Sequence, residues 1–303
     1  MPELPEVETI RRDLEKKILN KKIKDVLVLD KRSLKGESLS VFKKELKENK
    51  FIGIERRGKL LIFKLGLNLL SREGGMGYFG KFLLVHLKMT GQLIYTIHDI
   101  HNTIQTIAGG HSDSKNNFKL PNNHTRVIFE FSDNSKLYFN DLRVFGYLKI
   151  VNKQELEKVK QKFGVEPLSI ELTTSFIQSF IKNKKTILKA FLLDQKNIAG
   201  IGNIYADEIC FASQVLPSRR VNTLTKEEIN KILKNTKKIL KLAVEKRGTT
   251  FNNYRDSDGN KGNFIKYLKV FGRKGEKCKK CGNEIKKIKL VGRGTHYCVN
   301  CQS

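Results

Sequence analysis

The sequence predicts an α+β protein: a β-sandwich that packs against an N-terminal helix, then a helical domain that ends in a short cysteine-bearing β-hairpin. Three observations indicate this order. Apolar residues recur at helical spacing over residues 2–19, short runs with period-two alternation fill residues 22–150, and helical periodicity returns from about residue 153. Because helices and sheets must each bury an apolar face, we expect these segments to pack as separate layered domains.

The first predicted domain covers residues 1–151. Its opening helix places an apolar side chain every three or four positions from Val7 to Ile18. Residues 98–123 are polar and rich in glycine, asparagine and serine, so we expect a long loop there without regular structure. Strands are predicted, from their length, alternation and flanking turn residues, at Ile23–Leu29, Leu60–Leu65, Phe82–Leu87, Val127–Phe131 and Lys136–Phe139.

A helical domain is predicted over residues 152–265 and a cysteine-bearing tail over residues 266–303. Thr225 and Glu228 have the spacing of a capping box at the start of the longest helix. Cys210 lies on an apolar stripe, and we expect it in the core. The predicted helices are Lys153–Phe163, Thr174–Ile181, Ile187–Leu193, Asn203–Ala212 and Lys226–Lys246.

The chain is strongly basic, with 59 lysines and arginines against 31 acidic residues and a formal net charge of +28. A field of this sign attracts polyanions, which indicates nucleic acid or an anionic membrane as the partner. The sequence has no apolar run of about 18 residues that could cross a bilayer, and no secretion signal opens it. We therefore expect nucleic acid as the partner and the cytoplasm as the location.

Four cysteines near the C-terminus have the spacing of a zinc site. Cys278 and Cys281 form one CxxC pair. Cys298 and Cys301 form a second, and sixteen residues separate the two pairs. Four thiolates complete a closed tetrahedron, so we expect one structural Zn²⁺ rather than a catalytic metal. Disulfides are the alternative, which the absence of a secretion signal disfavours. His296 is an alternative ligand, but four cysteines already fill the site, so we expect this histidine at the surface.

Two further segments have features of phosphate binding. Arg293 lies between two glycines near the tip of the predicted hairpin, where its guanidinium can reach a phosphate. Gly200 and Gly202 precede a helix that begins at Asn203, and the exposed N–H groups at such a start can cradle a phosphate. The alternative for this second segment is a junction between two helices that needs glycine for its backbone angles.

The N-terminus carries a candidate nucleophile. Pro2 directly follows Met1, and a small residue at position 2 permits removal of the initiator methionine, which would leave a secondary amine. An α-amino group titrates near pKa ~7.7–8.0, so it can attack an electrophilic carbon at neutral pH and, as a secondary amine, give an iminium. Glu3, Glu6 and Glu8 lie beside it as acid/base partners. Proline and acids are also ordinary helix-start residues, and this segment alone favours that alternative.

Six segments follow one another along the chain: MPELPEVET at the start, RRGK at Arg56–Lys59, HLKMTG at His86–Gly91, NDLRVFG at Asn140–Gly146, GIGNIY at Gly200–Tyr205, and the cysteine segment. Together they resemble the bacterial formamidopyrimidine-DNA glycosylases, repair enzymes that remove 8-oxoguanine and ring-opened purines. The resemblance covers the chain apart from residues 98–123. It implies an N-terminal β-sandwich, a helix–two-turn–helix domain and a C-terminal zinc finger.

The resemblance implies catalytic roles for three residues. Pro2, freed from Met1, attacks C1′ of the damaged nucleotide and expels the base. Glu3 helps to protonate the deoxyribose and open its ring, and Lys59 contacts the phosphate or the lesion. Elimination on both sides of the abasic sugar, β,δ-elimination, then breaks the strand. For Lys59 the sequence alone leaves a solvated lysine at a strand end as the alternative.

The resemblance also implies DNA contacts. Asn203, Arg293 and His124 would hold backbone phosphate, although the segment around His124 departs from the family's usual pattern. These contacts would make damaged double-stranded DNA the partner of a monomeric enzyme.

Three more residues, Met89, Arg143 and Phe145, would fill the space left by the flipped-out nucleotide. Such a site needs an apolar wedge and a partner for the orphaned base. Without the resemblance, Met89 and Phe145 would be interpreted as core residues. Residues 247–264 correspond to the family's loop over the flipped base, where backbone amides and Thr249–Thr250 would recognise it.

The sequence therefore predicts a bacterial, cytoplasmic and nucleoid-associated base-excision-repair enzyme with both glycosylase and AP lyase activity. Two alternatives remain. One is an endonuclease VIII-like glycosylase for oxidised pyrimidines, which shares the N-terminal proline, Glu3 and the zinc finger. The other is a non-catalytic zinc-ribbon protein that only binds DNA. The methionine of HLKMTG together with DLRVFG favours the formamidopyrimidine branch.

Overall fold

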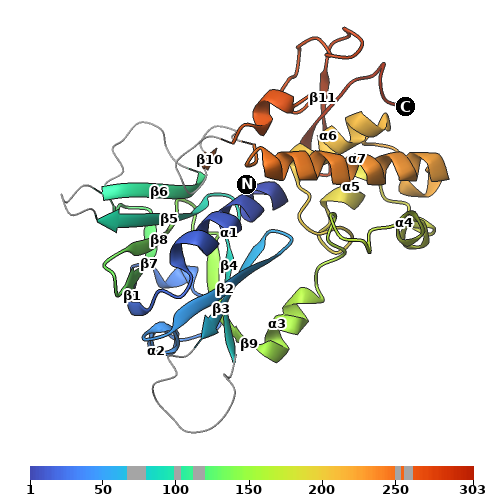
Figure 1. Cartoon of the computed structure of the whole chain (residues 1–303). Coiled ribbons are helices and arrows are strands. Elements are labelled where there is room, and N and C mark those ends of the chain that lie inside the picture. The colour runs from blue at the N-terminus through green and yellow to red at the C-terminus, as the bar shows by residue number, and fades with distance from the viewer. Residues whose placement is uncertain (67–79, 99–103, 112–119, 250–253, 256–261) are drawn as a thin grey trace. The chain divides into compact units, whose positions relative to one another are not determined.

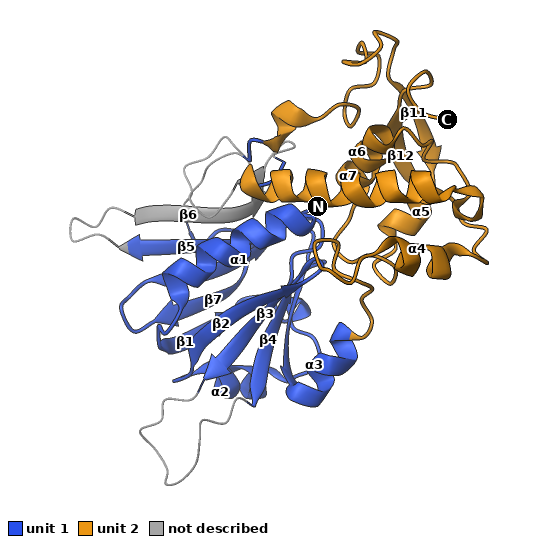
Figure 2. Ribbon diagram, turned by 45° about the vertical axis from the view of Figure 1, so that its right-hand side comes forward, with its two compact units in different colours: residues 1–160, 247–263 blue, residues 161–246, 264–303 orange. Residues whose placement is uncertain are grey.

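In the computed structural model, which describes most of the chain, the protein forms two compact units (Figure 2). The first unit comprises residues 1–160 and 247–263, and the second comprises residues 161–246 and 264–303. The described residues are 1–66, 80–98, 104–111, 120–249, 254–255 and 262–303.

Two antiparallel sheets form the first unit (Figure 1). The six-stranded sheet has the order β1-β7-β8-β5-β6-β10, with β1 at Ile23–Val28, β7 at Thr125–Phe131, β8 at Lys136–Asp141, β5 at Gly91–His98, β6 at Ile104–His111 and β10 at Tyr254–Arg255. The four-stranded sheet has the order β2-β3-β4-β9, with β2 at Lys50–Arg57, β3 at Leu60–Gly66, β4 at Lys81–His86 and β9 at Tyr147–Asn152.

Aromatic side chains from both sheets meet in one core, which confirms the predicted sandwich. The ring of Phe51 in β2 lies 5.1 Å from that of Phe63 in β3 and 5.9 Å from that of Phe129 in β7. The helix α1, Leu4–Ile18, buries its apolar stripe in the same core. The short elements η1 at Lys31–Ser33 and α2 at Leu39–Leu46 complete the covering.

The start of α1 is fixed by its own acidic residues. The backbone N–H of Glu3, the N-cap, donates to Glu6 Oε2 at 2.8 Å, as half of a capping box. Glu8 accepts hydrogen bonds from Arg11, Arg12 and Arg56, the last at 3.1 Å from β2. Burial would raise the pKa of Glu8, but these three guanidinium groups outweigh it and lower the pKa to about 2.

The prediction of a loop without regular structure over residues 98–123 is wrong at residues 104–111, which form strand β6. Residues 104–111 pair antiparallel with β5, from Gln92 opposite Gly110 to His98 opposite Ile104. Polar and glycine-rich composition concealed this strand, because ladder hydrogen bonds come from the backbone and do not require an apolar side chain. The parts of the expected loop at residues 99–103 and 112–119 lie outside the described residues.

The unit boundaries also differ from the predicted domain boundaries after residues 151 and 265. The first unit extends to Lys160, because α3 at Lys153–Lys160 packs on β9 and β4. Asn152 and Glu155 exchange side-chain to backbone hydrogen bonds and so cap α3 directly on the end of β9. Residues 247–263 belong to the first unit, and the cysteine tail shares one compact unit with the helices.

Four helices and a hairpin make up most of the second unit. They are α4 at Thr174–Ile181, α5 at Leu188–Leu193, α6 at Asn203–Ser213, α7 at Lys226–Glu245, and the strands β11 at Lys286–Leu290 and β12 at Arg293–Tyr297. Short turns η2 and η3 occur at Val221–Thr223 and Phe264–Tyr267. The predicted capping box of α7 is present. Cys210 is fully buried, as expected, and burial raises the pKa of its thiol.

A buried carboxylate attaches the tail to α6. Glu208 accepts the backbone N–H groups of Lys269, Val270 and Phe271 at 2.9–3.1 Å. Burial raises the pKa of Glu208, and the three N–H groups oppose that rise. Phe211 on α6 then packs against Val270, Ile285 and three of the cysteines in a small core.

Glu8→Gln should remove part of the acid sensitivity of the first unit. The folded pKa of Glu8 is depressed, so its ion pairs stabilise the fold above pH ~4.5 and are lost as the pH falls toward ~2. We expect the free energy of unfolding of the wild type to fall relative to that of Glu8→Gln over this window, by about 3 kcal/mol at most. Urea unfolding between pH 6 and pH 2.5 measures the difference.

Glu48→Gln is the matched control, because Glu48 pairs with Lys22 at the exposed surface. It should keep the pH dependence of the wild type. Identical slopes for Glu8→Gln and the wild type would show that the three guanidinium groups do not stabilise the ionised carboxylate.

Candidate functional site

The N-terminus of α1 is buried and tied to a second chain segment. Pro2 and Glu3 are both buried. Glu6 Oε1 accepts the backbone N–H of Thr249 at 2.7 Å, while its other oxygen accepts that of Glu3. Gly248 has φ +80°, and a Cβ there would lie 2.7 Å from Glu6 Oε1. The sequence analysis named Glu6 only as an acid beside Pro2. In the structure it links the N-cap of α1 to the backbone at Thr249.

Lys59 lies in the two-residue turn between β2 and β3. Its side chain is only 6% exposed, so the solvated strand-end alternative is wrong. Gly58 takes φ +56°, which lets the chain reverse there. The guanidinium of Arg56 donates from Nη1 to the Gly58 carbonyl at 2.8 Å and from Nε to Glu8, so the turn that carries Lys59 is attached to α1.

His86, which the sequence analysis did not single out, lies beside this turn. It ends β4, opposite Leu60, the residue after Lys59. Burial, followed by the charges of Lys88 and Lys59, lowers the pKa of His86 to about 3, so the imidazole is neutral near pH 7. Its Nδ1 accepts the backbone N–H of Lys88 at 3.0 Å, which leaves the hydrogen on Nε2. The sequence feature that could have indicated His86 is its position at the start of the HLKMTG segment.

Met89, Arg143 and Phe145, the predicted stacking trio, lie on two turns. Met89 is half-buried in the turn over residues 87–91, which closes with a 2.8 Å bond from the Gly91 N–H to the Leu87 carbonyl. Phe145 is 52% exposed, so it does not fill the core. The guanidinium carbon of Arg143, also exposed, lies 4.7 Å from the centre of the Phe145 ring. Such a pair presents one cationic and one apolar surface together.

The backbone of His124 is hydrogen-bonded to Asp141, which directly precedes the turn that carries Arg143 and Phe145. Its carbonyl accepts the N–H of Asp141 at 2.8 Å, and its own N–H donates to Asn122 at 2.9 Å. The side chain is half-buried. Its phosphate-binding role stays a prediction.

In the second unit, Asn203 and the tip of the hairpin are brought together. Gly200 has φ +91°, and Gly202 is the N-cap of α6, so glycine serves the backbone of this turn. The Asn203 Nδ2 donates to the carbonyl of Gly294 at 3.1 Å. Arg293, directly before Gly294, is exposed. The two predicted phosphate contacts are therefore neighbours, and one N–H of the Asn203 amide is already engaged within the protein.

A buried ion pair that the sequence did not reveal supports the same carbonyl. Lys189 and Asp207 are both fully buried, with Nζ 2.6 Å from Oδ1. Lys189 Nζ also donates to the Gly294 carbonyl at 3.1 Å. The other Asp207 oxygen accepts the backbone N–H of His296 at 2.8 Å. Helices α5 and α6 thus hold the first residues of β12 on both sides of Thr295.

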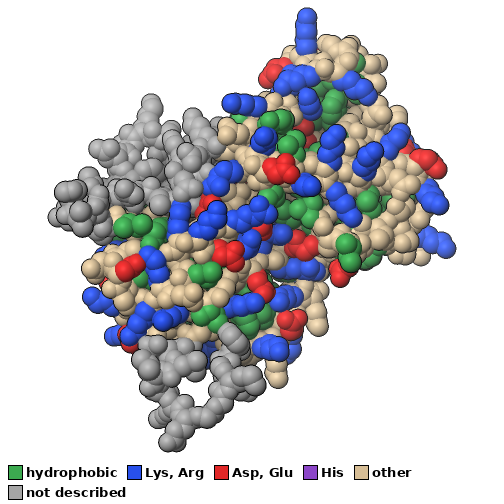
Figure 3. Space-filling view, in the orientation of Figure 1, with side chains coloured by type: hydrophobic (Ala, Val, Ile, Leu, Met, Phe, Trp, Pro, Cys, Tyr) green, Lys and Arg blue, Asp and Glu red, His purple; other side chains and the backbone are tan. Residues whose placement is uncertain are grey.

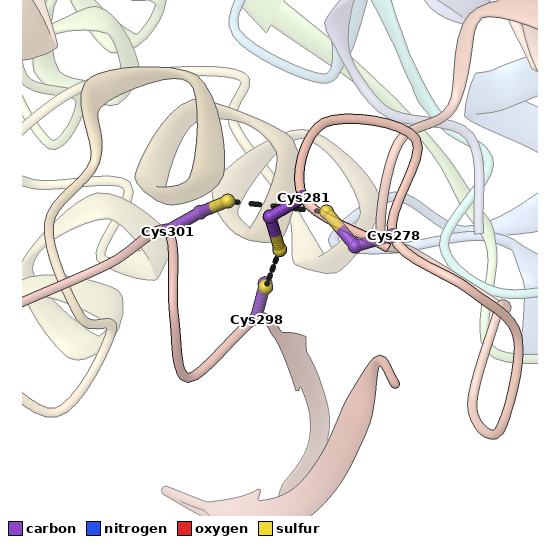
Figure 4. Close-up of side chains that lie close together, drawn as sticks. All are labelled: Cys278, Cys281, Cys298 and Cys301. Atoms are coloured by element: carbon purple, nitrogen blue, oxygen red, sulfur yellow. Dashed lines mark hydrogen bonds between the residues drawn. The ribbon is translucent and has the colours of Figure 1, made fainter. Parts of the chain in front are cut away.

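The four tail cysteines form a metal site (Figure 4). Their sulfur atoms all lie within 4.8 Å of one another, with Cys281 and Cys298 at 3.4 Å and Cys278 and Cys301 at 4.0 Å. Zn–S bonds of about 2.3 Å in a tetrahedron place sulfur atoms about 3.8 Å apart, so the set fits one zinc ion with four thiolate ligands. His296 is not a ligand, because its ring faces Asp207 and Phe271 instead. The same two contacts bury it, so the expected surface position is wrong.

Basic side chains cover much of each unit. Figure 3 shows lysines and arginines spread over the visible face, with acidic side chains among them. Among the described residues, no helix combines the length and the apolar character needed to cross a membrane. The structure therefore offers a charged surface for an anionic partner, together with a buried N-terminus and a closed metal site.

Three family models match consecutive parts of the chain. The N-terminal domain of formamidopyrimidine-DNA glycosylase matches residues 1–148, and the H2TH domain of the same enzymes matches residues 163–254. A zinc finger found in FPG and IleRS matches residues 275–303. The three matches follow the predicted order of sandwich, helical domain and zinc finger.

Full-length relatives extend these matches. A formamidopyrimidine-DNA glycosylase of Desulfitobacterium hafniense is 37% identical over 306 residues, which cover all of both chains. A solved complex of Lactococcus lactis Fpg with DNA containing an abasic site is 30% identical, with a TM-score of 0.82 over 99% of each chain. A second complex of that Fpg, with DNA containing an oxidized pyrimidine, is 31% identical, with a TM-score of 0.80 over the whole of both chains. The chain therefore belongs to the formamidopyrimidine-DNA glycosylase family.

Proposed function

We propose that this chain is a bifunctional DNA glycosylase and AP lyase that removes oxidised purines, such as 8-oxoguanine and formamidopyrimidines, from duplex DNA. The observation that carries the proposal is the buried N-terminus of α1, where Pro2 and Glu3 are buried and Glu6 accepts the backbone N–H groups of Glu3 and Thr249. Membership of the family over the full chain supplies the reaction type.

Pro2 is the nucleophile. While Met1 remains, the Pro2 nitrogen is an amide, so Met1 must first be removed, and its side chain is 39% exposed. The freed amine attacks C1′ of the damaged nucleotide, the bond from C1′ to the base breaks, and the base leaves with the electron pair and takes up a proton. This leaves C1′ bonded to both the Pro2 nitrogen and the ring oxygen. When the bond from C1′ to the ring oxygen breaks, the nitrogen lone pair forms the iminium, which activates the sugar for elimination.

Glu3 and Lys59 act on the sugar and its phosphates. The buried Glu3 carboxyl group supplies a proton to the deoxyribose ring oxygen as the ring opens. Lys59 holds the phosphate or lesion beside the turn that Arg56 attaches to α1. Loss of the 3′ phosphate and then of the 5′ phosphate breaks the strand on both sides of the sugar.

The stacking trio makes the sugar accessible. The enzyme must flip the nucleotide out of the helix, which costs a few kcal/mol. Met89 and Phe145 replace its stacking, and Arg143 contacts the orphaned base. The exposed cation–π pair of Arg143 and Phe145 supports this role.

The second unit holds backbone phosphate through Asn203 and Arg293, and His124 contributes a further phosphate contact from the first unit. One zinc ion, bound by Cys278, Cys281, Cys298 and Cys301, stabilises the tail that carries Arg293. Since every proposed contact lies on a single chain, we propose that the enzyme acts as a monomer on damaged DNA. Its place is then the bacterial cytoplasm, at the nucleoid.

Borohydride trapping tests the nucleophile. The wild type should form a covalent complex with an 8-oxoguanine duplex, because hydride reduces the iminium to a stable amine. Pro2→Gly should lose this complex, as should a chain with intact residues that retains Met1, verified by mass spectrometry. The second protein is the sharper control, because every side chain is kept while the Pro2 nitrogen is an amide and not an amine. Trapping by the chain that retains Met1, or DNA binding by the wild type without trapping, would refute the mechanism.

Two lesion duplexes separate the enzyme branches. Single-turnover excision should be faster on 8-oxoguanine opposite cytosine than on thymine glycol, by about tenfold or more, equivalent to ~1.4 kcal/mol in the barrier. Rates rather than mere binding must be compared, since the Lactococcus lactis Fpg has been solved with an oxidized pyrimidine. The reverse preference would favour an endonuclease VIII-like enzyme, and binding without excision of either base would favour a non-catalytic protein.

Zinc removal should abolish DNA binding before it unfolds the sandwich. The tail depends on the metal for its fold, whereas the core of the first unit is built from aromatic and aliphatic side chains. Fluorescence anisotropy with a lesion duplex, far-ultraviolet circular dichroism and zinc content should be followed during chelation. Cys210→Ala, which removes a buried thiol that is not a ligand, should keep zinc and binding. DNA binding that persists after complete zinc loss would contradict the proposed role of the tail.

A further inference from the structure

Asp141, the last residue of β8, is a carboxylate with no exposed surface. It lies between the turn that carries Met89 (residues 87–91) and the connection that carries Arg143 and Phe145 (residues 142–146, hereafter the wedge connection). Neither the sequence motifs nor the catalytic steps above gave it a role. Its hydrogen bonds reach both segments.

One carboxylate oxygen joins the two segments. Oδ1 accepts the backbone N–H of Arg143 at 3.2 Å and the hydroxyl of Thr90. The same Arg143 N–H also lies 3.1 Å from Thr90 Oγ1. The Asp141 carboxylate, the Thr90 hydroxyl and the Arg143 N–H are therefore hydrogen-bonded to one another. Because Thr90 directly follows Met89, this group connects the backbone of Arg143 to the residue beside Met89.

The other oxygen closes the wedge connection at its far end. Oδ2 accepts the backbone N–H of Gly146 at 2.6 Å. A Cβ at Gly146 would lie 2.8 Å from the Phe139 ring and 3.0 Å from this oxygen, so glycine allows the close approach. The carboxylate therefore bonds to the backbone on both sides of Phe145.

The wedge connection needs this support because its own packing is slight and its backbone is strained. Leu142 is 53% exposed and Phe145 is 52% exposed. Val144 has φ +54°, a left-handed conformation that costs a β-branched residue energy. Hydrogen bonds to a carboxylate acceptor are stronger than those between neutral groups and can hold such a conformation.

We propose that Asp141 is a positioning residue for nucleotide extrusion, which sets the relative placement of Met89, Arg143 and Phe145 through Thr90 and the wedge connection. The inference rests on the proposed function, because it presumes that these three side chains replace a flipped nucleotide. Asp141 touches neither the lesion nor the reacting atoms. Its effect falls on the step that opens the helix rather than on iminium chemistry.

The test variant is Asp141→Asn, which keeps the size of the side chain but has one acceptor oxygen instead of two. If its amide N–H₂ faces Gly146, the Gly146 N–H loses its acceptor; if it faces the other side, the Thr90 hydroxyl loses its acceptor and the Arg143 N–H keeps only Thr90 Oγ1. A lost hydrogen bond to a charged group is worth ~1.5–3 kcal/mol, which corresponds to about 10-fold to 100-fold in rate.

Two substrates separate extrusion from chemistry. On duplex DNA with 8-oxoguanine, single-turnover excision by Asp141→Asn should fall by about tenfold or more. On duplex DNA with a preformed abasic site there is no base to extrude, so borohydride trapping should stay within about twofold of the wild type. The fluorescence rise of a 2-aminopurine placed beside the lesion, which reports unstacking, should shrink in the variant.

Asp133→Asn is the matched control. Asp133 lies in the turn at the other end of β8 and likewise accepts a hydroxyl and a backbone N–H, both from Ser135. Its loss should lower neither rate. Thr90→Val, which keeps the shape of the side chain and removes only the hydroxyl link, should give the Asp141→Asn pattern in weaker form, and it keeps the test available if Asp141→Asn does not fold.

The outcomes are distinct. A selective loss of 8-oxoguanine excision and of 2-aminopurine signal, in Asp141→Asn or in Thr90→Val, supports the proposal. Equal losses on both substrates indicate a merely structural role and overturn it, as does unchanged excision. A wild type that neither excises nor traps shows instead that the proposed function is wrong, and the positioning role fails with it.

Discussion

A chain terminus that serves as a nucleophile, as we propose for Pro2, must be held still, although termini are the most mobile parts of most proteins. Glu6 meets this requirement with one buried carboxylate, which accepts the Glu3 N–H on one oxygen and the Thr249 N–H on the other. The first bond fixes the start of α1. The second fixes Thr249, which lies in the segment 247–263 that belongs to the first unit although it follows α7 in the chain. The backbone of Glu3, and with it the residue that precedes it, is thus linked through one acid to Thr249.

The second unit relies on a similar device. The ion pair of Lys189 and Asp207 is costly to bury, and it is stable only because further polar groups complete its hydrogen bonds. Those groups are backbone atoms of the hairpin, the Gly294 carbonyl and the His296 N–H. In both units, buried charged side chains thus bind backbone groups and fix residues at or beside the proposed functional positions.

Signals that are local in sequence predicted the structure well. Helix α4 was predicted with its observed bounds, the capping box of α7 was recognised from two residues, and the CxxC pairs indicated the metal site from spacing alone. Contacts between distant residues were not predictable, because residues 243 positions apart meet only in the folded state, as Glu6 and Thr249 do. Lys189 was missed since lysine is normally exposed, and β6 because its backbone pairing leaves no apolar pattern.

The division of the chain has a consequence for the order of biosynthesis. The first unit takes its last segment, residues 247–263, only after the helices from α4 to α7 have been made. A nascent chain that ends before residue 247 contains the described strands of both sheets except β10, but Glu6 has no Thr249 N–H to accept. Because domains tend to fold as they emerge from the ribosome, the surroundings of the proposed nucleophile are completed late, when the helices α4 to α7 of the second unit already exist.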